Sequence, residues 1–357
     1  MRKFLILVIM VLLLGGCERA QNALNQKTDA TIISSDSLND SFYPVYMSST
    51  VSDLRDSYYY HAITNPNDYK LLGRELQIKS LKYFSNQNHY FQEGQYLKLR
   101  DMDALLVRNR EGTSNEHSLQ PLFGDIIGNV ETPTMISTIF ETNFLIYSNG
   151  EYQLNGMSLA IALNPRTMER ESLTSPMDDE VIYEFAVLAA EKLFKYLREE
   201  LAIEVPIYIG FYLCATELSD HSGRYIGGVY SGEVFGSPER YYEEQVIFPS
   251  SHATSIDQGT ANEFSLIRSS LKQGAYEAIG VVGQAYYKES TIHYLNIQVT
   301  MNTKTYTESV TIIQYIADLI DQKLSEGYDV QVFVYSQDRL VGIVHRMAGQ
   351  KVKSTLL

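Results

Sequence analysis

The chain has 357 residues, of which 45% are hydrophobic and 20% charged, and its formal net charge is −14 at pH 7. A surface this acidic repels nucleic acid phosphates and anionic lipid headgroups, so the composition excludes a nucleic-acid-binding function and attachment to a membrane through a basic patch. The chain has two cysteines, Cys17 and Cys214.

The N-terminus has the pattern of a lipoprotein signal peptide. Two basic residues precede an unbroken apolar run over residues 4–14, which is too short for a helix that spans a bilayer. The run ends in Leu-Gly-Gly-Cys, a lipobox pattern that places cleavage between Gly16 and Cys17. We therefore expect diacylglycerol on the Cys17 thiol, which would anchor the chain to the outer face of the cytoplasmic membrane. An ordinary cleaved signal peptide would instead leave an unpaired reactive thiol there.

The remainder divides by composition into a tether and two halves. After the signal peptide (1–16), residues 17–41 carry the lipidated cysteine and a polar stretch too poor in apolar residues to fold. We predict a first half at 42–235, whose N-terminal part is an extension, a linker at 236–273 and a second half at 274–357.

The first half contains a strand, a helix and two further strands in that order. The strand at 157–163 leads to a helix, for which Ser175 is the predicted N-cap with Pro176 at the first helical position. Apolar residues at helical spacing continue to Leu197. The strand at 206–213 precedes Cys214, which has no partner for a disulfide once Cys17 is acylated. A glycine-containing strand follows at 227–230.

The second half repeats this order, although its sequence identity to the first is weak. Residues 294–299 alternate between apolar and polar, as expected for a half-buried strand. Thr305 and Glu308 form a capping-box pattern before a helix that Gly327 is expected to end. Strands follow at 330–335 and 340–344. The predicted class is α+β, with two tandem related halves, each a mainly antiparallel sheet covered by a helix.

Several sequence blocks, in their order along almost the whole chain, resemble the CamS family of sex-pheromone lipoproteins of Gram-positive bacteria. Those blocks are Phe91-Gln-Glu-Gly-Gln-Tyr-Leu97, Leu154-Asn-Gly-Met-Ser-Leu-Ala-Ile-Ala-Leu-Asn164, Val205-Pro-Ile-Tyr-Ile-Gly210, Val246-Ile-Phe-Pro-Ser-Ser-His-Ala-Thr254 and Gly280-Val-Val-Gly283.

The resemblance implies a surface lipoprotein whose cleaved signal peptide is processed to a short apolar peptide, which is secreted and sensed by enterococci that carry a responsive conjugative plasmid. The corresponding stretch here ends at Gly16. It departs from the family's best-known pheromone because it lacks an aromatic residue near its middle and ends in Gly-Gly. For the mature part of the protein, the resemblance implies no settled biochemical role.

Candidate ligand-binding residues come from clusters of polar and aromatic side chains. The chain has 27 tyrosines and no tryptophan, and phenol rings suit sugar or peptide ligands, although tyrosine also simply favours strands. The candidates are Phe91, Glu93, Tyr96, Pro249, Ser250, Ser251 and His252.

No catalytic, metal or cofactor site is predicted. The sequence Ser250-Ser251-His252 suggests a nucleophile and a base, but adjacent residues rarely face one another and no Gly-x-Ser-x-Gly elbow is present, so we interpret it as a turn. The seven histidines lack the spacing of a zinc site, and no phosphate-binding loop is found.

The favoured function is a non-enzymatic, membrane-anchored binding or scaffolding module whose partner is a peptide, a glycan or an envelope protein. Two alternatives remain open, a solute-binding lipoprotein of a transporter and an envelope hydrolase. The first needs several strand-helix units in each half, whereas the sequence contains one prominent helix per half. The second needs a nucleophile and a base within hydrogen-bond distance in a cleft.

Overall fold

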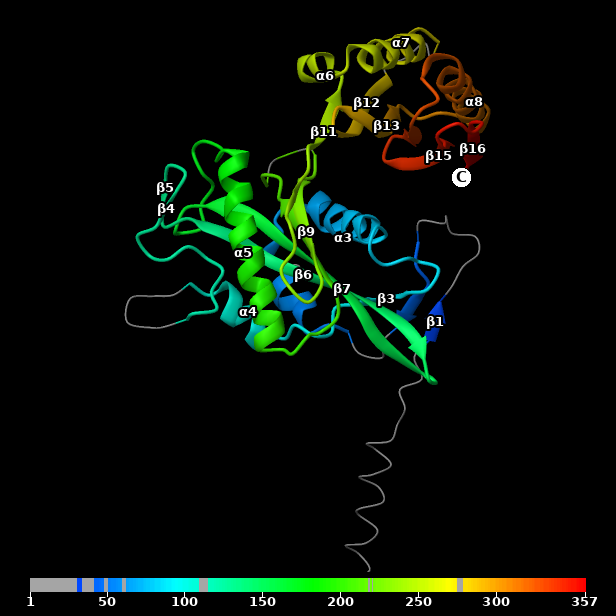
Figure 1. Ribbon diagram of the computed structural model, residues 1–357. Helices are drawn as coiled ribbons and strands as arrows, with labels where there is room; N and C mark the ends of the chain where they lie inside the picture. Colours follow the sequence, from blue (N-terminus) through cyan, green and yellow to red (C-terminus); the bar gives the residue numbers. More distant parts are fainter. Residues whose placement is uncertain are drawn as a thin grey trace, which may run out of the picture.

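The computed structural model describes residues 31–33, 42–47, 51–59, 62–108, 115–217, 219, 221–274 and 279–357. These residues form a mixed α+β structure, as predicted, with a larger first half and a smaller second half (Figure 1). Within the predicted tether (17–41), Thr31–Ile33 form the strand β1 instead. The signal peptide, Cys17 and the rest of the tether lie outside the described residues. The predictions made for them are therefore not tested by the structure.

The described part of the first half is built on an eight-stranded sheet in the order β1-β2-β3-β6-β7-β8-β9-β10. Its centre is the long hairpin of β6 and β7, which turns at Asn149 and Gly150, both with positive φ. The strands are β1 (Thr31–Ile33), β2 (Val45–Met47), β3 (Tyr90–Glu93), β6 (Thr134–Ser148), β7 (Glu151–Arg166), β8 (Ile207–Leu213), β9 (Arg224–Ser231) and β10 (Glu239–Arg240). A separate two-stranded ribbon pairs β4 (Ile126–Ile127) with β5 (Val130–Glu131).

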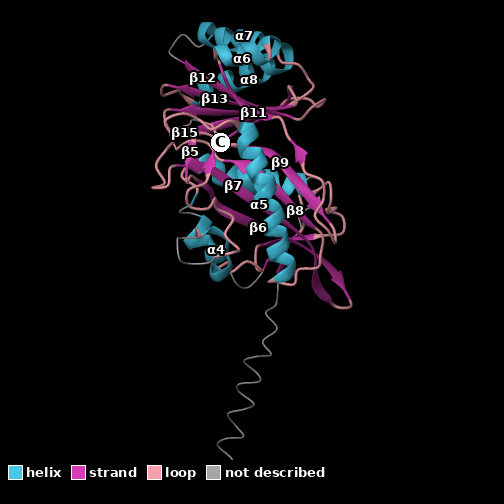
Figure 2. Cartoon of the chain, turned by 60° about the vertical axis from the view of Figure 1, so that its left-hand side comes forward, coloured by secondary structure: helices cyan, strands magenta, loops and turns pink. Residues whose placement is uncertain are grey.

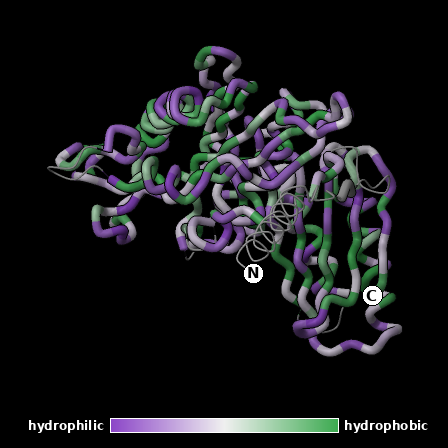
Figure 3. The backbone as a smooth tube through the Cα atoms, turned by 90° about the horizontal axis from the view of Figure 1, so that it is seen from below, coloured by the Kyte–Doolittle hydropathy of each residue, from purple (hydrophilic) through white to green (hydrophobic). Residues whose placement is uncertain are grey.

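The described part of the second half has a six-stranded sheet in the order β11-β12-β13-β14-β15-β16. Its strands are β11 (Glu243–Phe248), β12 (Ile279–Lys288), β13 (Thr291–Met301), β14 (Asp329–Ser336), β15 (Arg339–Arg346) and β16 (Lys353–Leu356). In Figure 3 the strands near the C-terminus alternate between hydrophobic and hydrophilic residues, because one face is packed and the other meets water.

The two sheets connect their central strands in the same way. In the first, β7 leads through α5 (Asp179–Glu199) to the parallel strand β8 and then to the antiparallel β9. In the second, β13 leads through α8 (Tyr306–Lys323) to the parallel strand β14 and then to the antiparallel β15. This is the predicted order of strand, helix, strand, strand in each half. The remaining registered pairs of both sheets are antiparallel, apart from a single parallel contact between β2 and β3.

The helix ends agree with the sequence prediction in one case and differ from it in two. The capping box of Thr305 and Glu308 begins α8, as predicted. The N-cap of α5 is Asp178 instead of Ser175, and its side chain accepts a hydrogen bond from the backbone of Glu180 at 2.8 Å. The C-cap of α8 is Leu324, three residues before Gly327. For α5, Ser175 and Asp178 are both suitable caps within four residues, whereas α8 ends before the glycine is reached.

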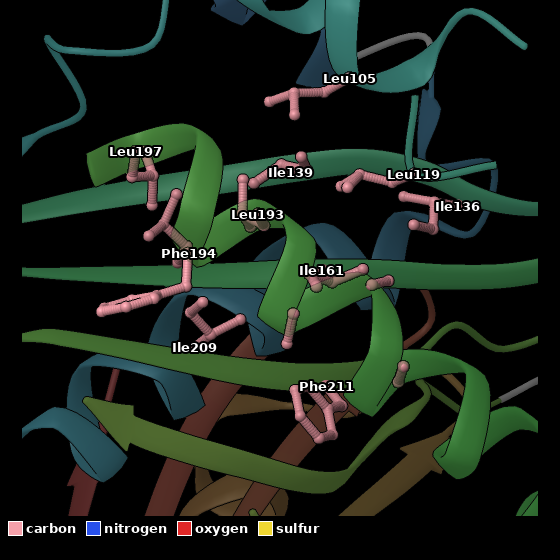
Figure 4. Packing of buried hydrophobic residues seen from close by; sticks show 14 of the residues in the cluster. Leu105, Leu119, Ile136, Ile139, Ile161, Leu193, Phe194, Leu197, Ile209 and Phe211 are labelled. Atoms are coloured by element: carbon pink, nitrogen blue, oxygen red, sulfur yellow. The ribbon is translucent and has the colours of Figure 1, made fainter. Parts of the chain in front are cut away.

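Helices cover both faces of the first sheet. On one face lie α5 and the short α4 (Leu99–Leu106), with leucines of α5 packed over isoleucines of β6, β7 and β8 (Figure 4). On the other face lies α3 (Pro66–Ser80), whose Leu72 and Leu76 pack against aromatic residues of the sheet. A five-residue π-helix, Arg55–Tyr59, adds Tyr59 to the first core. Each fully buried side chain of this kind contributes about 1.5–3 kcal/mol.

The predicted linker at 236–273 is instead folded: its strand β10 belongs to the first sheet, and its larger part belongs to the second half. It contains β11, α6 (Ser251–Ile256) and nearly all of α7 (Gln258–Gly274). Phe264, Ile267 and Leu271 of α7 are buried in the second core, so α7 covers the sheet together with α8 (Figure 2). The polar residues between these apolar positions lie on the solvent face of α7, which explains why the segment reads as a loop.

A buried ionic contact joins α3 of the first half to the sheet of the second. The ammonium of Lys79 forms an ion pair with Glu243 at the start of β11, and both side chains are at most 10% exposed. The phenol of Tyr286 on β12 also donates to Glu243. Lys79 lies over the rings of Tyr225 and Tyr241 as well, at 5.1 and 4.6 Å from their centroids. Burial lowers the pKa of Lys79, while Glu243 opposes that shift.

We expect Lys79→Met to destabilise the protein by about 3–5 kcal/mol, because the substitution leaves the buried carboxylate of Glu243 without its cation. Chemical denaturation of the purified protein measures this loss. The matched control is Lys82→Met, one turn away, whose partner Glu239 is half exposed. This control should cost at most about 1 kcal/mol. Equal losses for the two variants would contradict a structural role for the buried pair.

Candidate functional site

The first group of predicted site residues lies on and after β3. Phe91 is half-buried and its ring packs 6.2 Å from that of Tyr43 and 6.1 Å from that of Phe144. Glu93 pairs with Thr142 of β6 at the end of the strand. Tyr96 follows in a loop, on the rim of the sheet. Phe91 is therefore largely a packing residue.

This loop is held by a carboxylate that the sequence analysis did not single out. The fully buried side chain of Glu141, on β6, accepts hydrogen bonds from the backbone of Gln95, Tyr96 and Leu97 at 2.8–2.9 Å. The amide of Asn143 donates to it as well. Burial raises the pKa of Glu141, and these bonds oppose the rise. These hydrogen bonds give the Gly-Gln-Tyr-Leu stretch a structural role, that of a loop fixed to β6.

The second group begins α6, directly after β11. The hydroxyl of Ser250 accepts a hydrogen bond from the backbone of Ala253 at 3.0 Å and so caps the helix. His252 Nε2 lies 2.6 Å from Glu244 Oε1, across the end of the strand. Within the described residues, no hydrogen bond joins His252 to Ser250 or Ser251. The turn interpretation agrees with this capping role.

His252 is the member of the predicted set that borders the cavity we consider the candidate site. This cavity, of about 510 Å³, lies at the carboxyl ends of the parallel strands β7 and β8 and at the start of α5. Open α/β sheets bind ligands at that edge, and the volume is typical of a pocket for a small molecule or a short segment of a polymer. We call it the strand-end cavity.

Both halves line the strand-end cavity. The first half supplies an apolar floor that includes Leu173, Met177 and Leu213. The second half supplies Glu244, Gln245 and His252. A ligand in this cavity would therefore contact both halves at once.

The charged groups at the cavity are largely arranged in pairs. Arg224 forms an ion pair with Asp179 at the start of α5, and His252 contacts Glu244. The guanidinium of Arg166 donates to the hydroxyl of Ser172 at 3.1 Å. Arg166 and Asn164 also border a second cavity of about 640 Å³ on the other side of the β7 end. Arg224, His252 and Arg166 are thus each held by a neighbouring side chain.

The wall of this cavity formed by residues 214–216, 219 and 221–223 is fixed by a second buried carboxylate. Asp68 of α3 accepts hydrogen bonds from the phenol of Tyr212 and the backbone of Ala215, each at 2.8 Å, and from the backbone of Gly223. Burial raises the pKa of Asp68, and the three bonds oppose that rise. The amide of Asn65 donates to two carbonyls of the same loop. The wall is therefore preorganised from a distant part of the chain.

Cys214 is the free cysteine of the described part of the chain and lies in this wall. Part of its surface remains exposed where it borders the cavity, while the surrounding protein desolvates the thiol. That desolvation, and secondarily the charge of Asp68, raises the pKa of the thiol. A nucleophilic role would need the opposite shift.

The described residues hold no group of three or more His, Cys, Asp or Glu side chains that could bind a metal ion. Among the same residues, no helix combines the length and the apolar composition needed to cross a membrane.

Comparison with known proteins gives one family. The model of the family described as "CamS sex pheromone cAM373 precursor" matches residues 52–352. Among solved structures, the fold is similar to a sex pheromone precursor from Lactobacillus salivarius subsp. salivarius UCC118, with a TM-score of 0.79 and 21% identity over 92% of this chain and 98% of that one. It is also similar to the C-terminal domain of the sex pheromone staph-cAM373 precursor from Staphylococcus aureus, with a TM-score of 0.68 and 16% identity over 84% of this chain and 99% of that one. No curated protein gave a significant match.

We expect the Cys214 thiol to react slowly with thiol reagents at neutral pH while the protein is folded. Each unit of raised pKa lowers the thiolate fraction about tenfold, so labelling should be well over tenfold slower than in denaturant. A Cys17→Ser background leaves Cys214 as the single thiol. Thr216→Cys combined with Cys214→Ala places a thiol on the exposed part of the same wall and should react quickly. Equal rates for the two thiols would show that Cys214 is not desolvated.

Proposed function

This chain belongs to the CamS family of sex pheromone cAM373 precursors, and from that premise we propose that it is a surface lipoprotein with two products. One is the peptide released from its signal sequence. The other is the mature body, a non-enzymatic module that binds a peptide or glycan ligand of the cell envelope. The observation that carries the second part is the preorganised strand-end cavity, which both halves line.

Lipid attachment is supported by the sequence of the N-terminus. The small residues before Cys17 suit a lipoprotein signal peptidase, and the thiol is the group that accepts diacylglycerol. Two acyl chains provide stable anchoring without a spanning helix. The net charge of −14 argues against attachment by attraction to anionic lipids, so the acyl chains would supply the binding energy.

Mass spectrometry of the protein isolated from membranes should find Cys17 as the N-terminal residue with diacylglycerol on its sulfur. The Cys17→Ser variant should no longer partition with membranes. Cys214→Ser is the matched control, and its partitioning should match that of the unchanged protein. An unmodified Cys17, or an intact Met1 on the purified protein, would overturn the lipid anchor.

Cleavage before Cys17 would leave an apolar peptide that ends at Gly16. We expect fragments with this C-terminus in the culture medium, and a synthetic peptide of the same sequence should induce a conjugative response in enterococci that carry a responsive plasmid. A scrambled peptide of equal composition is the control. If the peptide is present in the medium but is no more active than the scrambled one, it is not a pheromone. The mature body would then be the only functional product.

We assign a binding function to the mature body because buried side chains fix the shape of the strand-end cavity. Asp68 and Asn65 fix one wall of the strand-end cavity through five hydrogen bonds. Preorganisation of this kind lowers the entropic cost of binding. The hydrolase alternative would need a serine activated by a base, whereas Ser250 caps α6 and His252 contacts Glu244. The transporter alternative would need more parallel strand-helix units than the single one in each described sheet.

Thermal-shift screening of the mature chain with cell-wall glycan fragments and extracellular peptides tests the assignment. A ligand at 100 times its Kd should add about 2.7 kcal/mol of stability. Thr216→Trp should fill the exposed part of the cavity wall and abolish the shift. The neighbouring variant Glu217→Trp, outside the wall, should retain it. A shift that survives Thr216→Trp would place the ligand elsewhere, and a ligand cleaved during incubation would indicate the hydrolase.

A further inference from the structure

Four tyrosine rings meet at the corner of the first sheet near the free end of the β6–β7 hairpin. Tyr46 of β2, Tyr90 of β3, Tyr147 of β6 and Tyr152 of β7 form what we call the tyrosine cluster. The ring of Tyr152 lies 4.9 Å, centroid to centroid, from each of the other three. Tyr147 and Tyr152 are also direct cross-strand partners.

The tyrosine cluster lies outside the buried cores of both halves, and its outermost ring, that of Tyr147, faces solvent. The Tyr147 side chain is 58% exposed, and the other three rings are partly buried. The hairpin end from 144 to 154 contains one charged residue, Glu151, in a chain whose charged fraction is 20%. The corner is therefore an exposed, nearly uncharged aromatic surface on an otherwise acidic protein.

Sheet stabilisation accounts for only part of this arrangement. A cross-strand aromatic pair contributes about 0.2–1 kcal/mol, which explains why Tyr147 and Tyr152 face one another. It does not explain why tyrosines from β2, β3 and the hairpin gather at one corner of the sheet, with Tyr147 exposed. Clustered exposure of this kind marks a contact surface.

The position of this corner relative to the N-terminus identifies the partner. The described fold begins at Thr31 in β1, which lies beside the hairpin end in Figure 1. Four strand spacings separate β1 from β7, or about 20 Å. The 14 residue steps from Cys17 to Thr31 can span at most about 50 Å. A lipid on Cys17 would therefore keep the tyrosine cluster within reach of the bilayer.

We propose that the tyrosine cluster is a membrane-contact surface that lies in the headgroup region of the bilayer to which Cys17 is anchored. The inference rests on the proposed lipid anchor. Tyrosine is enriched at this depth because its ring is apolar and its hydroxyl remains hydrated. The contact would orient the body, with the second half directed away from the membrane, and it requires no basic residues.

The absence of tryptophan from the chain provides a direct test. Tyr147→Trp introduces a single fluorescent reporter at the cluster, and Tyr306→Trp introduces one at a residue of the second half that is 73% exposed. The lipidated proteins are bound to phosphatidylcholine vesicles with and without brominated acyl chains. We expect bromine to quench the emission of the Tyr147→Trp variant at least twofold, with a shift to shorter wavelength, and to leave the Tyr306→Trp variant unchanged.

A parallel experiment separates this inference from the lipid anchor. An N-terminal hexahistidine tag replaces Cys17 and holds each variant on vesicles that contain a nickel-chelating lipid. If the tagged Tyr147→Trp variant is quenched, the membrane-contact surface is supported. If the protein isolated from cells also carries no lipid, the proposed anchor at Cys17 is overturned. Equal quenching of the Tyr147→Trp and Tyr306→Trp variants on vesicles would overturn the surface. The membrane-contact surface would also be overturned if the emission of the Tyr147→Trp variant changed with soluble cell-wall glycan but not with vesicles. That result would indicate a glycan-binding surface.

Discussion

The buried ion pair of Lys79 and Glu243 is the contact on which the relation of the two halves depends. Removing two charges from water is costly, and the cost is offset only if the partners remain in register. Glu243 is the first residue of β11, and the next residue, Glu244, lines the strand-end cavity. Alternate side chains of a strand point to opposite faces, so the strand that pairs with Lys79 also presents Glu244 to the cavity. The same strand therefore holds the contact between the two halves and forms part of the candidate site.

Buried carboxylates also hold loops in place elsewhere in the first half. Asp68 holds the loop after β8, and Glu141 holds the loop after β3. Each accepts several backbone hydrogen bonds from residues that have no regular partner, which satisfies donors that would otherwise be buried without one. These bonds hold the backbone of Ala215, Gly223 and residues 95–97 in place. Preorganisation of the cavity wall follows from this.

Local patterns predicted the elements whose stability is local. The alternation at 294–299 and the capping box at Thr305 depend on neighbours within a few residues, and both predictions were correct. The prediction failed for 236–273, where the apolar positions of α7 are separated by Ser, Asn and Gln. The site was less predictable still. Asp68 acts on residues more than 140 positions away, so a single sequence gives no sign of it, and of the predicted set only His252 borders the cavity.

The N-terminal ribbon has a mechanical consequence. β1 is held to β2 by a ladder of three residues, and β2 is registered to β3 at the single pair of Val45 and Phe91. Under the proposed attachment, a pull between membrane and body enters at Thr31 and loads this ladder before it reaches the long β6–β7 pairing. Peeling β1 and β2 away would lengthen the connection by about 55 Å. It would withdraw Tyr43 from the aromatic residues under α3, while the core under α5 and the core of the second half would keep all their residues. The ribbon would then yield to force first and spare the folded body.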